Sequence, residues 1–378
     1  MISSKLKKKK LIKVIDTPYS SFILEKIFAD YNEFNQIIEI KKDQGETKLK
    51  SINILKLTQK KIYSKNKFIT TNSIAFSLSR FRIINILNFR KLQKSILKKI
   101  SFNQDKVYIG SRTSTIMNVL PTTNRILIDH GFSDYNRKTI KITNFKRMID
   151  SIKEKISDAI GYPYVSLNDD LNSYTVCKIP KFFSNFIDMQ DLPINKVLKK
   201  FFNTVKKKYP RTDTIFLLTK NWQINFYKGT HNDIDYDKIN FELIKKYASK
   251  GKNFFIKFHD FTIQSNQSNS SFIQKAHRYG YHAVDIDSYL KPCYRGMIPA
   301  ELLISKLKLK RVISKYSSTL HNISHNRSLN CIMDMNPELN LITNHSKHYK
   351  LPLLKKYKER YNFNKITRGR VDIRPINK

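Results

Sequence analysis

The sequence predicts an α/β chain built from two doubly wound lobes. Short apolar runs typical of strands alternate with amphipathic helical segments, a pattern that favours parallel sheets covered by helices on both faces. The chain has 378 residues, more than a single hydrophobic core usually serves, and its 40% hydrophobic content is enough to fill two cores. We place the lobes at residues 1–192 and 193–345, followed by a basic C-terminal segment at 346–378.

In the first lobe, strands are expected at residues 10–15 and 106–109, and helices at about 22–29 and at 147–159. The loops at 16–21 and 110–114 follow the two strands, and the second of these is placed to approach a substrate. In the second lobe the pattern predicts a helix, two strands and a polar, mobile loop, in that order: 196–208, 214–219, 253–260 and 264–271.

Residues 125–131 form the most informative segment, because an apolar strand delivers Asp129 and His130 onto a glycine turn at Gly131. At the carboxyl edge of a parallel sheet these side chains would lie where open α/β sheets bind their ligands. A turn with a capping carboxylate is the alternative interpretation of the same residues. The sequence does not decide whether Asp129 or His130 would act as a base.

Three later segments also end in side chains that could carry chemistry. The strand-like run at 253–260 carries His259 near its end. Pro299 and Glu301 precede an apolar helical run, and a strand that begins at Lys310 leads to Ser317 and Ser318. Each also has an ordinary interpretation: a half-buried histidine, a glutamate that complements a helix dipole, and hydroxyls that cap a helix.

This order of motifs resembles that of the bacterial sialyltransferases and polysialyltransferases. Carried over residue by residue, Asp129 takes the first acidic position, His259 the histidine, Glu301 the glutamate of a Pro-x-Glu segment that begins at Pro299, and Ser317 and Ser318 the hydroxyl pair. Two positions depart from the family pattern: His130 replaces a second carboxylate, and Asp260 replaces a proline. The resemblance implies a GT-B fold, in which two Rossmann-like lobes face a cleft.

The resemblance also implies an inverting transfer of sialic acid from CMP-sialic acid to a hydroxyl of a capsular polysaccharide or lipooligosaccharide. Asp129 or His130 would remove the hydroxyl proton, and His259 with the serine pair would stabilise the departing phosphate. Glu301 would accept hydrogen bonds from the ribose hydroxyls. The prediction includes no metal and no cofactor besides the CMP-sugar donor.

The net charge of +41 predicts a polyanionic or membrane-surface partner, because 71 lysines and arginines stand against 30 acids. An anionic glycan acceptor and the anionic inner face of the cytoplasmic membrane both fit, so we expect a cytoplasmic protein that is peripheral at that membrane. The basic start at 7–10 is followed by too short and too charged a run for a signal peptide. Cys177, Cys293 and Cys331 show no metal-ligand spacing, and we expect free buried thiols.

Three alternative functions remain open. Glycerophosphotransferases that use CDP-glycerol also have a His-Gly pair after a strand and a Tyr-Ser-Ser segment, as at His130-Gly131 and at 316–318. A CMP-Kdo transferase is a close variant of the sialyltransferase hypothesis. A nucleic-acid-binding protein is a remote third, because the charge alone supports it and no recognition motif accompanies it.

Overall fold

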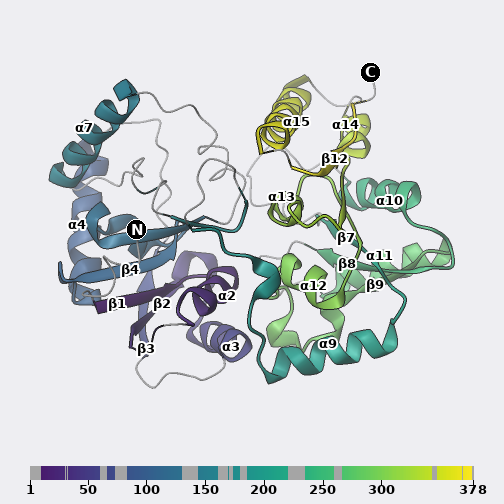
Figure 1. The fold of residues 1–378 in the computed structure, drawn as a ribbon, viewed down its shortest axis with the longest axis horizontal. Helices are drawn as coiled ribbons and strands as arrows, with labels where there is room; N and C mark the ends of the chain where they lie inside the picture. Colours follow the sequence, from purple (N-terminus) through teal and green to yellow (C-terminus); the bar gives the residue numbers. More distant parts are fainter. Residues whose placement is uncertain are drawn as a thin grey trace. The chain divides into compact units, whose positions relative to one another are not determined.

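The computed structural model describes residues 10–29, 31, 33–59, 66–72, 83–129, 144–160, 169, 173–178, 185–219, 235–258, 266–342, 347–367 and 369–376. The chain divides into two compact units after Asn195, close to the boundary that we placed after Leu192 (Figure 1). Each unit is described by itself.

The first unit contains a six-stranded, wholly parallel sheet in the order β3-β2-β1-β4-β5-β6. Its strands are β1 Lys10–Ile15, β2 Asn35–Lys41, β3 Asn66–Thr71, β4 Lys106–Ser111, β5 Arg125–Asp129 and β6 Tyr174–Thr175. This is the strand order of the Rossmann fold, and its direction of winding reverses between β1 and β4. Ligands of such sheets bind beyond the carboxyl ends of the strands at this switch point.

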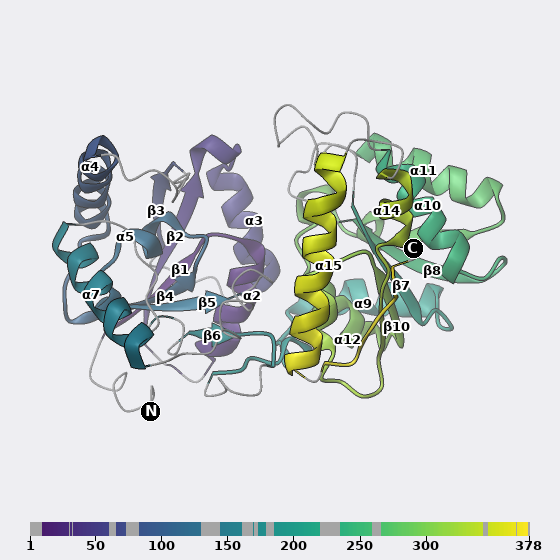
Figure 2. The ribbon, with the colours of Figure 1, turned by 90° about the horizontal axis from the view of Figure 1, so that it is seen from above.

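The described helices of the first unit cover both faces of its sheet, with α2 and α3 on one face and α4, α5 and α7 on the other (Figure 2). Their bounds are α2 Pro18–Ile27, α3 Lys48–Thr58, α4 Ile83–Ile100, α5 Thr115–Val119 and α7 Asn144–Ile160. Helix α2 begins four residues before the expected position 22. Thr17 and Ser20 form a reciprocal capping box there, and Pro18 occupies the first helical turn.

The second unit repeats the same topology. Its strands are β7 Thr214–Leu218, β8 Asn253–Phe258, β9 His282–Asp285, β10 Arg311–Ser314, β11 Asn330–Met333 and β12 Val371–Ile373. The sheet runs β12-β11-β10-β7-β8-β9, which is again the Rossmann order when it is followed from β9, with the switch point between β7 and β10. The prediction of an α/β chain with two doubly wound lobes is therefore confirmed, and two such lobes in tandem are the domain content of the GT-B fold.

The helices described in the second unit are α9 Lys196–Lys208, α10 Tyr236–Tyr247, α11 Asn266–Arg278, α12 Ala300–Leu307, α13 Ser318–Ile323, α14 Asn336–Ile342 and α15 Lys347–Thr367. Two expectations are corrected. Most of the expected loop at 264–271 is the beginning of α11, because the buried Phe272 and Ala276 give this polar sequence an apolar anchor. The basic C-terminal segment is also no separate element, because β12 pairs with β11 in the sheet.

Both sheets are packed by large apolar side chains. Ile12, Val14 and Tyr108 of the first sheet meet Phe89 and Met117 of its helices. In the second unit, an equivalent cluster joins the phenylalanines of β7 and β8 to α10 and α11. The three cysteines are free, as predicted; Cys177 and Cys331 are buried, whereas Cys293 is half-buried. Burial raises the pKa of the Cys331 thiol to about 12, which keeps it protonated and unreactive.

His321 makes the second unit sensitive to acid. Its ring is buried on α13 against Phe363 of α15, with 5.1 Å between the ring centroids. Burial, with a smaller contribution from the positive charge of Arg360, lowers the pKa of His321 to about 3. Between this value and the ordinary 6.5, the unfolded chain binds a proton that the folded chain does not. The free energy of unfolding therefore falls as the pH falls through this window.

We expect His321 alone to remove about 2 kcal/mol of stability between pH 6.5 and about pH 4.5. Each pH unit well inside the window is worth about 1.4 kcal/mol, and the first unit is worth less because the unfolded histidine is only partly protonated there. Urea unfolding at several pH values, compared between the wild type and His321→Gln, measures this contribution. The matched control is His282→Gln, because His282 is exposed in the same unit. Equal pH slopes in the wild type and His321→Gln would contradict the prediction.

Candidate functional site

Asp129 lies at the carboxyl end of β5 with its carboxylate fully buried. Its Oδ1 is ion-paired with Nε of Arg112, which follows β4, and its Oδ2 accepts a hydrogen bond of 2.9 Å from Oγ of Ser173. The backbone supports this pairing, because the N–H of Arg112 donates to the carbonyl of Ile128 and Asp129 pairs with Thr175 in the ladder. Asp129 thus connects the ends of three strands.

These contacts leave Asp129 poorly placed to take a proton from a substrate. Both carboxylate oxygens have a donor, and one of these donors is the positively charged guanidinium of Arg112. The Asp129 side chain is suited instead to fix the positions of Arg112 and Ser173, and with them the ends of the neighbouring strands. His130, the next residue, lies outside the described residues.

A second polar cluster lies at the switch point of the first unit, where β1, β2 and β4 end. Asp16 follows β1, and its Oδ2 accepts from Oγ1 of Thr113 at 2.6 Å and lies 3.4 Å from Nζ of Lys41. The same ammonium donates to the carbonyl of Thr113 at 2.9 Å. Of the loops expected at 16–21 and 110–114, residues 18–21 belong to α2 and residues 110–111 to β4. The short segments that follow β1 and β4 are held together by the buried charges of Asp16 and Lys41.

Glu39 of β2 extends this cluster. Its oxygens accept from Oγ1 of Thr71 at 2.6 Å, from Oγ of Ser114 at 2.5 Å and from the N–H of Thr115 at 3.0 Å. Burial, and then the nearby negative charge of Asp16, raises the pKa of Glu39.

Glu301 occupies the first turn of α12, two residues after Pro299 at the N-cap, as the Pro-x-Glu pattern predicted. The carboxylate is buried, and its Oε1 accepts a hydrogen bond of 2.6 Å from Nδ2 of Asn322 on α13. This bond fastens α12 to α13, the helix that begins with the predicted hydroxyl pair. The hydrogen bond from Asn322 therefore links Glu301 to the helix that begins at Ser317 and Ser318.

Ser317 is the N-cap of α13, and Ser318 is the first residue of that helix. The Ser317 Oγ accepts from the N–H of Thr319 at 3.3 Å, and its own N–H donates to Oγ of Ser314 at the end of β10. The alternative interpretation of Ser317 as a helix cap is thus confirmed. Both serines remain partly exposed beside the switch point between β7 and β10.

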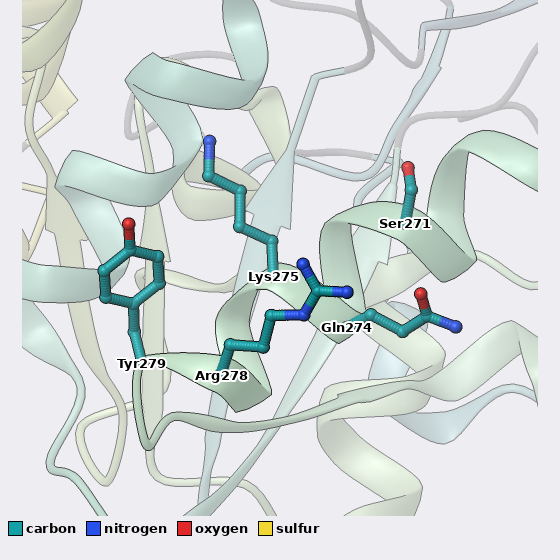
Figure 3. Close-up of a pocket in the computed structure, with 5 residues that line it drawn as sticks. All are labelled: Ser271, Gln274, Lys275, Arg278 and Tyr279. Carbon is teal, nitrogen blue, oxygen red and sulfur yellow. The ribbon is translucent and has the colours of Figure 1, made fainter.

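His259 follows β8 directly and lies outside the described residues, as does Asp260. Helix α11, which comes next, has a shallow hollow on its surface, lined by Ser271, Gln274, Lys275, Arg278 and Tyr279 (Figure 3). Figure 3 shows the side chains of Lys275 and Arg278 extending from this helix, and no predicted site residue within the described ranges lines the hollow.

No protein-family profile matches the sequence, and the comparison with curated proteins finds no match. Among solved structures, the chain is similar to one described as the wall teichoic acid polymerase TagF, studied with CDPG. The sequence identity is 11%, the TM-score is 0.39, and the match covers 90% of this chain and 72% of that chain. A likeness this distant says nothing about substrate or mechanism.

Lys315 is the main residue at the second switch point that sequence reasoning missed. It follows β10, is almost completely buried, and lies 3.2 Å from Oε2 of Glu338 and 4.0 Å from the ring centroid of Tyr236. Burial lowers the pKa of this ammonium, against the opposing effect of Glu338. The available signal was a lysine that directly follows a strand and lies two residues before the serine pair.

The two sets of residues are suited to different chemical tasks. The first unit has a buried ion pair and a carboxyl cluster at its carboxyl edge, which can orient a base and hold a hydroxyl-bearing acceptor. The second unit has hydroxyls at its carboxyl edge, which can donate hydrogen bonds to a phosphate. None of the helices in the described ranges combines the length and apolarity needed to cross a bilayer.

Proposed function

We propose that this protein is a transferase that uses a cytidine nucleotide donor, releases CMP and builds a cell-surface polymer. The carrying observation is that Asp129 in one lobe, and Glu301 with the serine pair in the other, each lie at the carboxyl edge of a Rossmann-type sheet. This is the place where such sheets bind ligands. The acceptor is assigned to the first lobe and the donor to the second, in accord with the motif resemblance.

Glycerol phosphate transfer from CDP-glycerol is the favoured reaction. The contacts of Asp129 with Arg112 and Ser173 occupy both of its oxygens, which leaves the base role to His130. A histidine base followed by Gly131, together with the Tyr-Ser-Ser segment at 316–318, is the pattern that resembles the CDP-glycerol enzymes. The acceptor hydroxyl forms a bond to the glycerol-bearing phosphorus, CMP leaves with the electrons of the broken P–O bond, and His130 takes the proton.

Transfer of sialic acid from CMP-sialic acid is the second candidate. The connection between the Pro299-x-Glu301 segment and the helix of the serine pair favours it, because this pairing is the donor-binding pattern of the sialyltransferases. In that reaction the acceptor oxygen bonds to the anomeric carbon and CMP leaves from the opposite face. Ser317, Ser318 and His259 would stabilise the leaving phosphate in either reaction.

The test is the release of CMP by the purified full chain from CDP-glycerol, CMP-sialic acid and CMP-Kdo, each with and without an anionic polymer acceptor. We expect acceptor-stimulated release from CDP-glycerol. Ser318→Ala should reduce this release at least tenfold, because the lost hydroxyl faces the departing phosphate. Ser271→Ala on α11 is the matched control and should leave it unchanged.

Release only from CMP-sialic acid would transfer the same residues to the second candidate. Release from none of the three donors would overturn the proposal. Equal losses in Ser318→Ala and Ser271→Ala would contradict the assignment of the donor site.

A further inference from the structure

Helix α7 carries an apolar ridge that faces solvent. Met148, Ile152 and Ile156 are spaced four residues apart, so they lie on one face of the helix. Their side chains are 54%, 49% and 52% exposed, although residues of these types are usually buried. Isolated exposed apolar residues are ordinary, whereas a continuous row of three marks a binding surface.

The opposite side of α7 is fixed to the body of the first unit. Oε1 of Glu154 accepts a hydrogen bond of 2.8 Å from Oγ1 of Thr122, and Ile149 and Asp150 are half-buried. Since Asp150 and Glu154 lie about half a helical turn away from the ridge residues, the ridge points away from the sheet. It is a surface feature of a docked helix.

Helix α4, which covers the same face of the sheet as α7, has a positively charged surface (Figure 2). Its 18 residues contain no acid, and five basic side chains are exposed: Arg90, Lys91, Lys94, Lys98 and Lys99. Gln93 of α4 donates to the carbonyl of Val119, and α7 is held to Thr122 of the same short segment. Figures 1 and 2 both place α4 and α7 at the same edge of the first unit.

We propose that α7 and the basic face of α4 form a docking surface for an anionic lipid bilayer. An apolar ridge next to basic side chains is the arrangement by which helices lie in the interfacial region, with the ridge among the acyl chains and the cations near anionic headgroups. A symmetric contact with a second copy of the chain would bring the two all-basic α4 surfaces together, which is electrostatically unfavourable. The proposal does not depend on which donor the enzyme uses.

The test is co-sedimentation of the full chain with vesicles of phosphatidylcholine alone or mixed with phosphatidylglycerol. We expect binding to the mixed vesicles, and at least a tenfold loss of partitioning in the variant Met148→Ser, Ile152→Ser, Ile156→Ser. Replacing Lys91, Lys94 and Lys98 by glutamine should also weaken binding to the mixed vesicles. The matched controls are Leu49→Ser, at an exposed apolar residue on α3, and glutamine at Lys199, Lys200 and Lys206 on α9.

A second readout does not depend on loss of binding. Ile152→Trp should give a blue-shifted emission, relative to the wild type, when mixed vesicles are added, whereas Leu49→Trp should not. Wild-type partitioning by the triple serine variant, or equal losses in the α9 control, would overturn the proposal. A wild-type dimer that becomes monomeric in the serine variant, with vesicle binding unchanged, would assign the ridge to a second copy instead.

Discussion

A chain with glutamine in place of His130 is expected to lose about 10²- to 10⁴-fold in turnover while its affinity for the cytidine donor is retained. The expectation follows from the position of Asp129, whose two oxygens are bound by Arg112 and Ser173 at the end of β5. With that carboxylate engaged, the imidazole next to it in sequence is the group available to take the proton of the acceptor hydroxyl. Imidazole is suited to this step because it exchanges protons near neutral pH.

Single-turnover release of CMP and equilibrium binding of the donor separate the two effects. Asp129→Asn is the comparison variant: it keeps the shape of the side chain but removes its charge, so we expect a smaller loss of turnover than in His130→Gln. If Asp129→Asn abolishes transfer while His130→Gln stays within threefold of the wild type, the carboxylate itself is the base.

The bounds of many single helices and strands depend on residues close together in the sequence, and these bounds could be predicted. The strand expected at 10–15 and the helix expected at 196–208 have those bounds in β1 and α9, because apolar runs and the spacing of Leu198, Phe201 and Phe202 define them. The order of the strands was not predictable in the same way. It depends on pairings such as β1 with β4, which join residues about a hundred positions apart.

In the candidate site, too, local features could be predicted and contacts between distant residues could not. That Asp129 and Ser317 would follow strands could be predicted from the residues next to them. The partners could not, because Arg112 reaches Asp129 only through the neighbouring strand, and Glu338 reaches Lys315 through α14. The prediction of a loop at 264–271 was wrong, because it followed the many serines and asparagines of this segment. The helix is held by Phe272 and Ala276, which come after the segment and pack into the core.

Removing one partner of the Arg112–Asp129 pair is expected to lower the free energy of unfolding more than removing both partners does. Arg112→Met leaves a fully buried carboxylate without its cation, and removing one partner of a buried pair costs about 3–5 kcal/mol. Asp129→Val leaves the buried guanidinium instead, with a similar expected cost. In the double variant both charges of this pair are removed, so its stability should return to within about 1–2 kcal/mol of the wild type. The remaining loss reflects the hydrogen bond that Ser173 no longer makes.

Urea unfolding measures the three variants, and hydrogen exchange of peptides from β4 and β5 assigns the changes to the first lobe. The matched control is Lys245→Met, which breaks the exposed pair with Glu242 and should change the free energy of unfolding little. The double variant also separates structure from catalysis. If it is stable but releases CMP slowly, the carboxylate positions the base in addition to holding the strands. If its turnover returns with its stability, the pair serves the fold alone, and additive losses of stability would show that the two side chains are not coupled.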